Sequence, residues 1–197
     1  MGAADRHDED AELVRRTLAN EPDAFAQLYE QHRDGVYRLA YHFVHNTQDA
    51  LDLCQEIFVR AFESLPSFQG RSRFRTWLMR IASNTCIDFV RQAKVRRAGE
   101  LDEHTTDRDQ RVPGGGGPPE PSRGPEQEEM RAAIDAAVAQ LSADHRAVFL
   151  LHAVEGMTYQ EIAEAVDCPV GTVMSRLHYA RKRLQGLLAW LKKDEAR

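Results

Sequence analysis

The sequence has little cysteine and no long apolar run, which excludes several classes of protein. Its three cysteines, Cys54, Cys86 and Cys168, lie far apart and form no CxxC pair, so we expect free, buried thiols with no disulfide or metal site. No stretch reaches the roughly 20 apolar residues that span a membrane, and the acidic start MGAADRHDEDAE differs from a secretion signal. We therefore expect a cytoplasmic protein with no direct membrane insertion.

Catalytic motifs are lacking as well. None of the eight histidines stands in a hydrolytic or metal-binding pattern such as HExxH, and His145, His152 and His178 fit helix faces. The sequence predicts a protein that is not an enzyme, with no catalytic residues, no cofactor and no small-molecule substrate.

Glycine and proline are concentrated in one stretch. The run PGGGGPP at residues 113–119 lacks large apolar side chains, so it cannot build regular hydrogen bonding or a core. We assign residues 98–129 to a flexible acidic linker between two small helical domains, residues 22–97 and 130–192, and residues 1–21 to an acidic N-terminal extension. A hydrophobic fraction of 42% is enough for two ordinary cores.

The net charge of −5 hides two basic blocks. Residues 60–97 contain 9 basic and 2 acidic residues, net +7, and residues 176–197 contain 7 basic and 2 acidic residues, net +5. The rest is acidic: residues 1–59 have net −7 (5 basic, 12 acidic), 98–131 net −5 (4 basic, 9 acidic) and 132–175 net −5 (1 basic, 6 acidic). This distribution predicts two separate contacts with nucleic acid and two acidic surfaces for other partners.

Hydrophobic spacing predicts an all-α protein, because apolar residues recur every three or four positions without strand-like alternation. The first domain has three or four helices: one over about residues 25–43, one from Asp49 to Leu65 and one from Phe74 to Arg91. The expected buried residues of the last two are Cys54, Ile57, Phe58, Ala61, Phe62 and Leu65, followed by Phe74, Trp77, Leu78, Ile81, Thr85 and Phe89.

The second domain contains a helix-turn-helix signature. A helix through Val148 ends at Gly156, and Thr158 with Glu161 three residues later forms a capping box that opens a short helix. Asp167 stands at the tight turn, where a positive φ is usual and Asp tolerates it better than most residues. The final helix then buries Val170, Val173, Leu177, Ala180, Leu184, Leu188 and Leu191.

The exposed face of this final helix is basic, as in a recognition helix that enters the major groove. A basic helix alone is more often a solvated face, but its coincidence with the capping box and the turn favours DNA. The residues expected on this face are Thr172, Ser175, Arg176, Tyr179 and Arg183, with Met174 and His178 at its edges and Arg181 and Lys182 adding backbone attraction.

The first domain has a second basic face and an acidic strip. Arg73, Thr76, Arg80, Asn84 and Arg91 recur at helical steps after a polar, basic loop over residues 67–73, which suits a displaced single strand. Trp77 fits the core better than it fits base stacking. The helix before it presents Asp52, Gln55, Glu56 and Val59, and these residues fit a solvated face and a protein-docking surface equally well.

Four stretches resemble the extracytoplasmic-function (ECF) sigma factor family: DALDLCQEIFVRAF (49–62), FRTWLMRIASNTCIDFVR (74–91), LSADHRAVFLLHAVEGMTYQEIAEAV (141–166) and CPVGTVMSRLHYARKRL (168–184). The resemblance covers about residues 22–97 and 130–190 and implies sigma region 2 followed by sigma region 4. It implies three contact sets: Asp49, Asp52, Leu53, Gln55, Glu56 and Phe58 for RNA polymerase core; Arg71, Arg73, Arg75, Thr76, Trp77, Arg80, Asn84 and Arg91 for the minus-10 element; and Thr172, Met174, Ser175, Arg176, His178, Tyr179, Arg181, Lys182 and Arg183 for the minus-35 element.

The resemblance also implies the partners. These are RNA polymerase core, promoter DNA as duplex and as melted strand with an extruded base, and an inhibitory anti-sigma factor; the acidic linker resembles the segment that members thread toward the RNA exit path. Met174 and Tyr179 stand where members often carry basic residues, which implies fewer phosphate contacts or a different preferred sequence. The rival interpretation is an autonomous helix-turn-helix regulator that binds its operator without polymerase, but it leaves residues 22–97 without a task.

Overall fold

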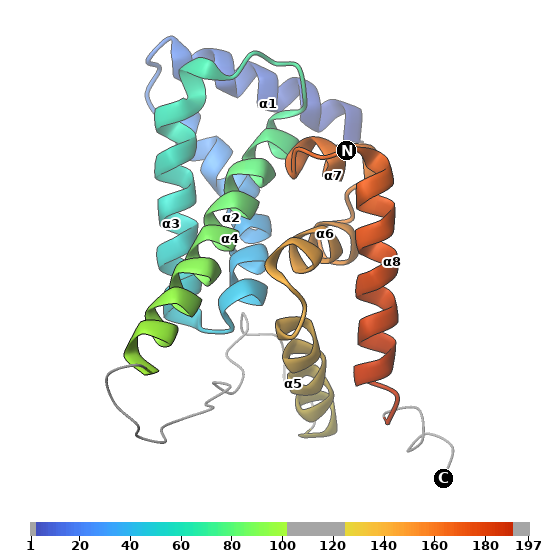
Figure 1. Cartoon of the computed structure of the whole chain (residues 1–197). Helices are drawn as coiled ribbons and strands as arrows, with labels where there is room; N and C mark the ends of the chain where they lie inside the picture. The colour runs from blue at the N-terminus through green and yellow to red at the C-terminus, as the bar shows by residue number, and fades with distance from the viewer. Residues whose placement is uncertain (1–2, 102–124, 191–197) are drawn as a thin grey trace.

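The protein folds as two groups of helices that lie side by side (Figure 1). The computed structural model describes residues 3–101 and 125–190 and contains only helices and turns over these ranges, as predicted. The first group consists of α1 (Ala3–Leu18), α2 (Ala24–Val44), α3 (Thr47–Ser64), the 3₁₀ helix η1 (Leu65–Ser67) and α4 (Phe74–Leu101); the second of α5 (Pro125–Ala139), α6 (Ala143–Ala153), α7 (Tyr159–Ala165) and α8 (Val170–Leu187). Most of the predicted linker, residues 102–124, lies outside the described residues.

Local signals set several helix ends. Asn46 caps α3 by accepting a hydrogen bond from the Asp49 backbone N–H at 3.0 Å, and Ser142 caps α6 through the His145 N–H at 3.4 Å. Helix α3 ends two residues before Pro66, which lies within η1. Gly156 follows α6 with a φ of 64°, so the predicted end of this helix is confirmed.

Three helical segments extend beyond the sequence prediction. Helix α4 continues past Arg91 to Leu101, because the residues that follow its apolar stripe are mostly good helix formers. Helix α5 begins at Pro125, since the N–H that proline lacks has no partner in a first turn. Residues 3–18, expected only as an acidic extension, form α1, whose Leu13 and Val14 are buried.

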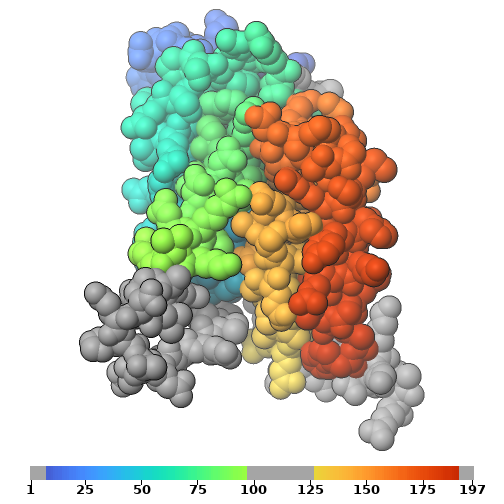
Figure 2. Space-filling view, in the orientation of Figure 1, coloured from blue at the N-terminus to red at the C-terminus, as the bar shows by residue number. Residues whose placement is uncertain are grey.

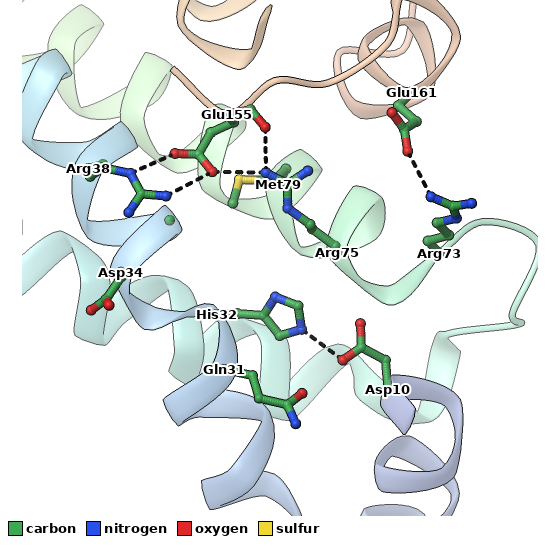
Figure 3. A pocket seen from close by; sticks show the side chains of 11 residues that line it. Asp10, Gln31, His32, Asp34, Arg38, Arg73, Arg75, Met79, Glu155 and Glu161 are labelled. Atoms are coloured by element: carbon green, nitrogen blue, oxygen red, sulfur yellow. Dashed lines mark hydrogen bonds and ion pairs between the residues drawn. The ribbon is translucent and has the colours of Figure 1, made fainter. Parts of the chain in front are cut away.

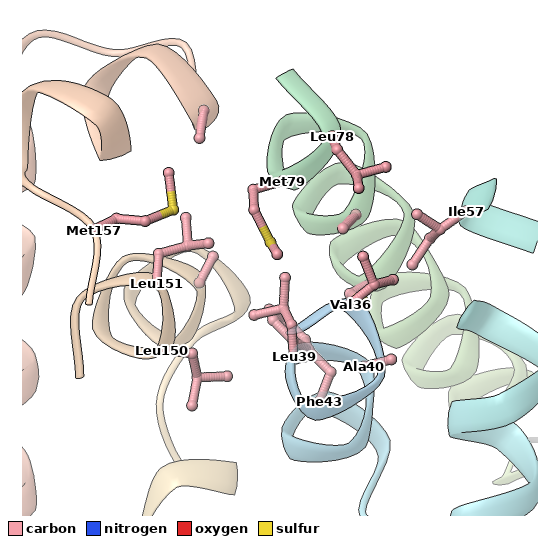
Figure 4. Close-up of a cluster of buried hydrophobic side chains, with 14 of the residues drawn as sticks. Val36, Leu39, Ala40, Phe43, Ile57, Leu78, Met79, Leu150, Leu151 and Met157 are labelled. Atoms are coloured by element: carbon pink, nitrogen blue, oxygen red, sulfur yellow. The ribbon is translucent and has the colours of Figure 1, made fainter. Parts of the chain in front are cut away.

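A single apolar cluster extends across both groups of helices. Figure 4 shows Leu39 of α2 and Met79 of α4 on one side, and Leu151 of α6 and Met157 on the other; all four side chains are buried. The predicted burial of Phe62 is wrong, because this residue is 54% exposed; its ring meets the ring of Phe25 in a T-shaped arrangement, with centroids 4.9 Å apart. Within the described residues, α3 packs mainly on α2 and α4, so part of its surface faces solvent.

Arg146 links the two groups through the backbone. Its guanidinium donates to the carbonyl of Phe43 in α2 at 3.0 Å and to the carbonyls of Ala139 and Leu141 beside α5. Burial lowers the pKa of Arg146 to about 10. These contacts satisfy carbonyls at helix ends that have no partner within their own helix.

Candidate nucleic-acid interface

The helix-turn-helix of α7 and α8 has the predicted local geometry. The Thr158 hydroxyl accepts from the Glu161 N–H at 3.3 Å, and the Glu161 carboxylate accepts from the Thr158 N–H at 2.9 Å. Asp167 has a φ of 50° in the turn. The predicted capping box and the left-handed Asp167 are both confirmed, and together they fix the direction in which α8 leaves the turn.

Helix α8 has one buried stripe and one exposed basic face. Val173, Leu177, Ala180 and Leu184 are buried, as predicted, whereas Val170 and Leu188 are only half-buried and Leu191 lies outside the described residues. Within the described residues, no carboxylate forms an ion pair with any basic side chain of this helix. On the remaining surface, Met174, Ser175, His178, Tyr179, Arg181, Lys182 and Arg183 are exposed, and Thr172 and Arg176 are half-buried.

The first half of the basic face of α8 lies close to α6 and α4. The ring of Tyr179 lies 4.5 Å from the ring of His145, centroid to centroid. Arg176 lines a cavity of about 220 Å³ together with Asn84, Arg91 and Asp144. Burial and the nearby Arg176 charge lower the pKa of His145, and Asp144 opposes this effect. The cavity brings a residue expected at the minus-35 element next to one expected at the minus-10 element.

The basic face of α4 lies against the second group of helices, because α4 packs on α6 and α7. Figure 2 shows the surface of α4 beside that of the second group. Three arginines of α4, and Arg73 just before it, are paired with carboxylates from that group. The N–O distances are 3.6 Å for Arg73 and Glu161, 3.0 Å for Arg75 and Glu155, 2.9 Å for Arg80 and Asp167, and 3.2 Å for Arg91 and Asp144. In this arrangement these arginines are neutralised by the chain itself.

The other residues expected at the minus-10 element lie in different surroundings. Arg71 and Asn84 are exposed. Trp77 is half-buried against Phe68 and Phe74, with ring centroids 5.1 and 5.6 Å away, which agrees with the predicted core role. The predicted outward position of Thr76 is wrong: its side chain is buried, because α4 is covered by the first group of helices on one side and by α6 and α7 on the other.

The acidic strip of α3 faces solvent. Asp49, Asp52, Gln55 and Glu56 are exposed, and the neighbouring apolar residues Leu51 and Val59 are 50% and 51% exposed. Glu56 forms an exposed ion pair with Arg60 at 2.6 Å. Leu53 and Phe58, expected in the same contact set, are instead buried in the core, so their contribution is to position the helix.

Comparison with known proteins assigns both groups of helices. A model of sigma-70 region 2 matches residues 28–96, and a model of sigma-70 region 4 matches residues 131–184. The RNA polymerase sigma-H factor of Pseudomonas aeruginosa is 35% identical over 189 residues, 92% of this chain and 96% of that protein. The ECF RNA polymerase sigma-E factor of Escherichia coli K12 is 35% identical over 179 residues, 89% of this chain and 92% of that protein. The chain belongs to the ECF sigma factor family.

Two solved structures of sigma factors share this fold. RpoE, in complex with the anti-sigma factor NepR from Bartonella quintana, is 26% identical with a TM-score of 0.65, covering 85% of this chain and 98% of that chain. CnrH, in complex with the cytosolic domain of CnrY, is 26% identical with a TM-score of 0.67, covering 92% of this chain and 97% of that chain. The matched ranges place α2 to α4 in sigma region 2 and α5 to α8 in sigma region 4.

The carboxylates that face region 2 were not foreseen from the sequence. Glu155, Asp167 and Asp144 do not form a motif, and the acidic block over residues 132–175 was assigned to an unspecified partner. Its charge, opposite to that of residues 60–97, is the signal that could have identified region 2 as that partner. A buried pair between His32 and Asp10, at 2.9 Å, was also missed.

The three cysteines carry free thiols. Cys54 and Cys86 are buried and free, and burial raises the pKa of the Cys54 thiol to about 11. Cys168 is also free. In the described parts of the chain, no group of three or more His, Cys, Asp or Glu side chains could hold a metal ion. None of the helices described is both long and apolar enough to cross a membrane.

Proposed function

We propose that this sigma factor binds RNA polymerase core and directs promoter-specific initiation without catalytic chemistry of its own. The observation that carries the proposal is the presence of region 2 and region 4, in that order, in one chain that aligns along nearly its whole length with sigma factors. A protein that works on the polymerase acts in the cytoplasm.

The strip of α3 is the surface proposed to dock on the polymerase. Asp49, Asp52, Gln55 and Glu56 provide exposed carboxylates and amides, and Leu51 and Val59 add exposed apolar area beside them. A polar strip with an apolar component is typical of protein interfaces. Because the carboxylates of this strip repel the phosphates of DNA, we expect α3 to bind the protein partner and not the promoter.

Region 2 is proposed to recognise the minus-10 element as a melted strand. The loop before α4 carries exposed Arg71 and Arg73, and exposed Asn84 has an amide that can donate to and accept from a base edge. The arginines of α4 attract phosphates, while the captured base supplies sequence preference. Trapping an extruded base favours strand opening without any input of chemical energy.

Region 4 is proposed to read the minus-35 element as duplex. Ser175, Arg176 and His178 lie on the recognition helix, and Arg181, Lys182 and Arg183 provide positive charge for the backbone. Met174 and Tyr179 are each 54% exposed on the same helix. Because neither carries a positive charge, we expect apolar contacts there, such as one with a thymine methyl group, in place of phosphate contacts.

An anti-sigma factor is the proposed inhibitory partner. The two similar solved structures are sigma factors held by NepR and by CnrY. The two sigma factors in those structures align with 85% and 92% of this chain. We therefore propose a partner that contacts both groups of helices.

Reconstituted transcription tests the proposal. RNA polymerase core with this chain should initiate at a defined set of promoters from the native host, and core alone should not. Substituting the minus-10 or the minus-35 element of such a promoter should each reduce the run-off product. Equal products with and without the chain would contradict the proposal.

A further inference from the structure

Helix α1 lies outside the segment that matches sigma region 2, yet it is anchored in the same core. The match begins at residue 28, whereas α1 covers Ala3–Leu18. Leu13 and Val14 of this helix are buried in the apolar cluster. Apolar burial is not directional, so these two side chains hold α1 on the core without fixing where its polar side chains lie.

Asp10 is a buried charge on α1. This residue is 5% exposed, and its carboxylate accepts a hydrogen bond from Nε2 of His32 in α2 at 2.9 Å (Figure 3). A buried carboxylate must be paired, and apolar residues of the same volume often stabilise a fold as well as a buried ion pair does. We therefore read the pair as a contact that specifies the position of α1 against α2.

The ring of His32 extends this contact to the first residue of α4. It lies 5.3 Å from the ring of Phe74, centroid to centroid, and Phe74 lies 6.0 Å from the ring of Phe68 in an edge-to-face arrangement. Phe68 begins the loop over residues 68–73, which connects η1 to α4, and Phe74 follows its last residue. A continuous series of contacts thus runs from Asp10 to both ends of this loop.

Helix α1 also packs on the two elements that flank the loop. It contacts η1, which precedes the loop, and α4, which follows it, and Figure 1 shows α1 and the loop at the same end of the molecule. The tip of the loop is open: Gly70 has a φ of 65°, and a Cβ there would have no atom within 4 Å apart from its chain neighbours. Gln69 and Arg71 on either side are exposed. Within region 2, the position of the tip is therefore set by the two ends of the loop.

We propose that the pair of Asp10 and His32 is a positioning element for the loop that captures the extruded base of the minus-10 strand. This inference rests on the proposed function of the loop. Selective capture requires the loop to present its donors and acceptors where the base arrives, and a site displaced by about 1 Å loses much of its selectivity. Helix α1 acts through His32 and Phe74 and does not contact the base itself.

Variants of the full chain, assembled with RNA polymerase core, test this role. Asp10→Ala removes the acceptor of the hydrogen bond, and Asp10→Asn keeps an oxygen that can accept from Nε2 of His32. Glu9→Ala is the matched control, because Glu9 is an exposed carboxylate of α1 that contacts α2 through Gln31 at 3.1 Å.

The readout is the ratio of the holoenzyme affinities for two labelled single strands. One strand carries an intact minus-10 element, taken from a promoter at which the chain initiates in run-off transcription, and the other carries the same bases in scrambled order. Affinity for core and discrimination at the minus-35 element are measured on the same proteins.

Asp10→Ala should lower this ratio at least about fivefold, whereas Asp10→Asn and Glu9→Ala should keep it near the wild-type value. His32→Gln keeps a donor for Asp10 and removes the ring that lies on Phe74, so it should lower the ratio without leaving the buried carboxylate unpaired. It tests the same contacts if Asp10→Ala loses helical circular dichroism. Core affinity and minus-35 discrimination should stay at their wild-type values in all of these variants.

Wild-type ratios in both Asp10→Ala and His32→Gln would overturn the proposal. A parallel loss of core affinity and of minus-35 discrimination would also overturn it, since that result indicates a general structural role. A wild-type holoenzyme without any preference for the intact strand would contradict the proposed function of the loop, and the inference with it. The two failures are therefore distinguishable.

Discussion

The Glu155 carboxylate lies 3.0 Å from the Arg75 guanidinium, although 80 positions separate the two residues in the sequence. Arg75 belongs to the helix proposed to meet the minus-10 strand, and Glu155 precedes the helix-turn-helix proposed to read the minus-35 element. The buried Glu155 thus links the two parts that are proposed to bind the promoter, through ion pairs with Arg38 and Arg75. We expect any change that separates these two parts to alter both proposed contacts with DNA.

Substitution at the α3 strip should weaken binding to the polymerase. Glu56→Ala removes an exposed carboxylate whose pair with Arg60 is solvated, so folding stability should change by less than about 0.5 kcal/mol. If Glu56 docks on core, its loss should reduce affinity about fivefold, equivalent to ~1 kcal/mol. Biolayer interferometry with immobilised core measures this, with Glu164→Ala as the control. An unchanged Kd would remove Glu56 from the docking surface.

Arg176 should contribute to sequence preference, whereas Lys182 should contribute only to overall affinity. Arg176→Ala should reduce holoenzyme discrimination between an intact and a scrambled minus-35 element by about 1–3 kcal/mol, because a side chain that reads a base is lost. Lys182→Ala should weaken binding to both sequences and reduce the salt slope by about 1. Competition binding at several salt concentrations separates the two effects. Full discrimination by Arg176→Ala would place this residue outside the recognition surface.

Removal of the α7 cap should lower the stability of region 4. Thr158→Ala deletes the hydroxyl that accepts from the Glu161 N–H, which should lower the free energy of unfolding by about 1 kcal/mol. Thr158→Ser keeps the hydroxyl and should restore most of the loss. Urea denaturation followed by circular dichroism measures both variants. Equal stability of Thr158→Ala and wild type would show that the cap does not contribute.

Acidification should destabilise the fold through His45. Burial lowers the pKa of His45 from 6.5, Asp135 opposes this effect, and the nearby Arg146 and His42 charges add to the lowering. Neither ring nitrogen has a hydrogen-bond partner within the described residues. Because the folded pKa is below the unfolded one, the stability due to neutral His45 is complete above about pH 6.5 and is lost as the pH falls below that value.

The measurement is the free energy of unfolding at about pH 7.5 and pH 5.5 for wild type and His45→Asn. Asparagine tolerates the φ of 52° at this position and does not titrate. The variant should lose less stability on acidification than the wild type. Some loss should remain, since the pKa of His145 is also lowered. Identical losses in the two proteins would exclude His45 as the source.

The elements were predictable from the sequence because their signals are local. The capping box at Thr158, the left-handed Asp167 and the buried stripe of Val173 and Leu177 each depend on residues a few positions apart. These signals also placed the basic face of α8. The same periodicity failed at Phe62 and Thr76, where burial is decided by which other helices cover the position.

The docking of region 4 on region 2 could not be predicted in the same way. It depends on pairs such as Arg75 with Glu155 and Arg80 with Asp167, which lie 80 and 87 positions apart and have no common spacing. The charge sums show that residues 60–97 are basic and residues 132–175 are acidic. They do not show that these two segments contact each other. The need for glycine at position 35 is visible only in the folded structure, where a Cβ would lie 2.9 Å from Oε2 of Glu155.

The most direct test of the central claim compares promoter binding with and without RNA polymerase core. A labelled duplex carrying minus-35 and minus-10 elements is incubated with the chain alone, with core alone and with both, and the complexes are separated on a native gel in the presence of competitor DNA. We predict a sequence-specific complex only when chain and core are combined. A specific complex formed by the chain alone, with the same affinity after core is added, would contradict the account and support an autonomous DNA-binding regulator.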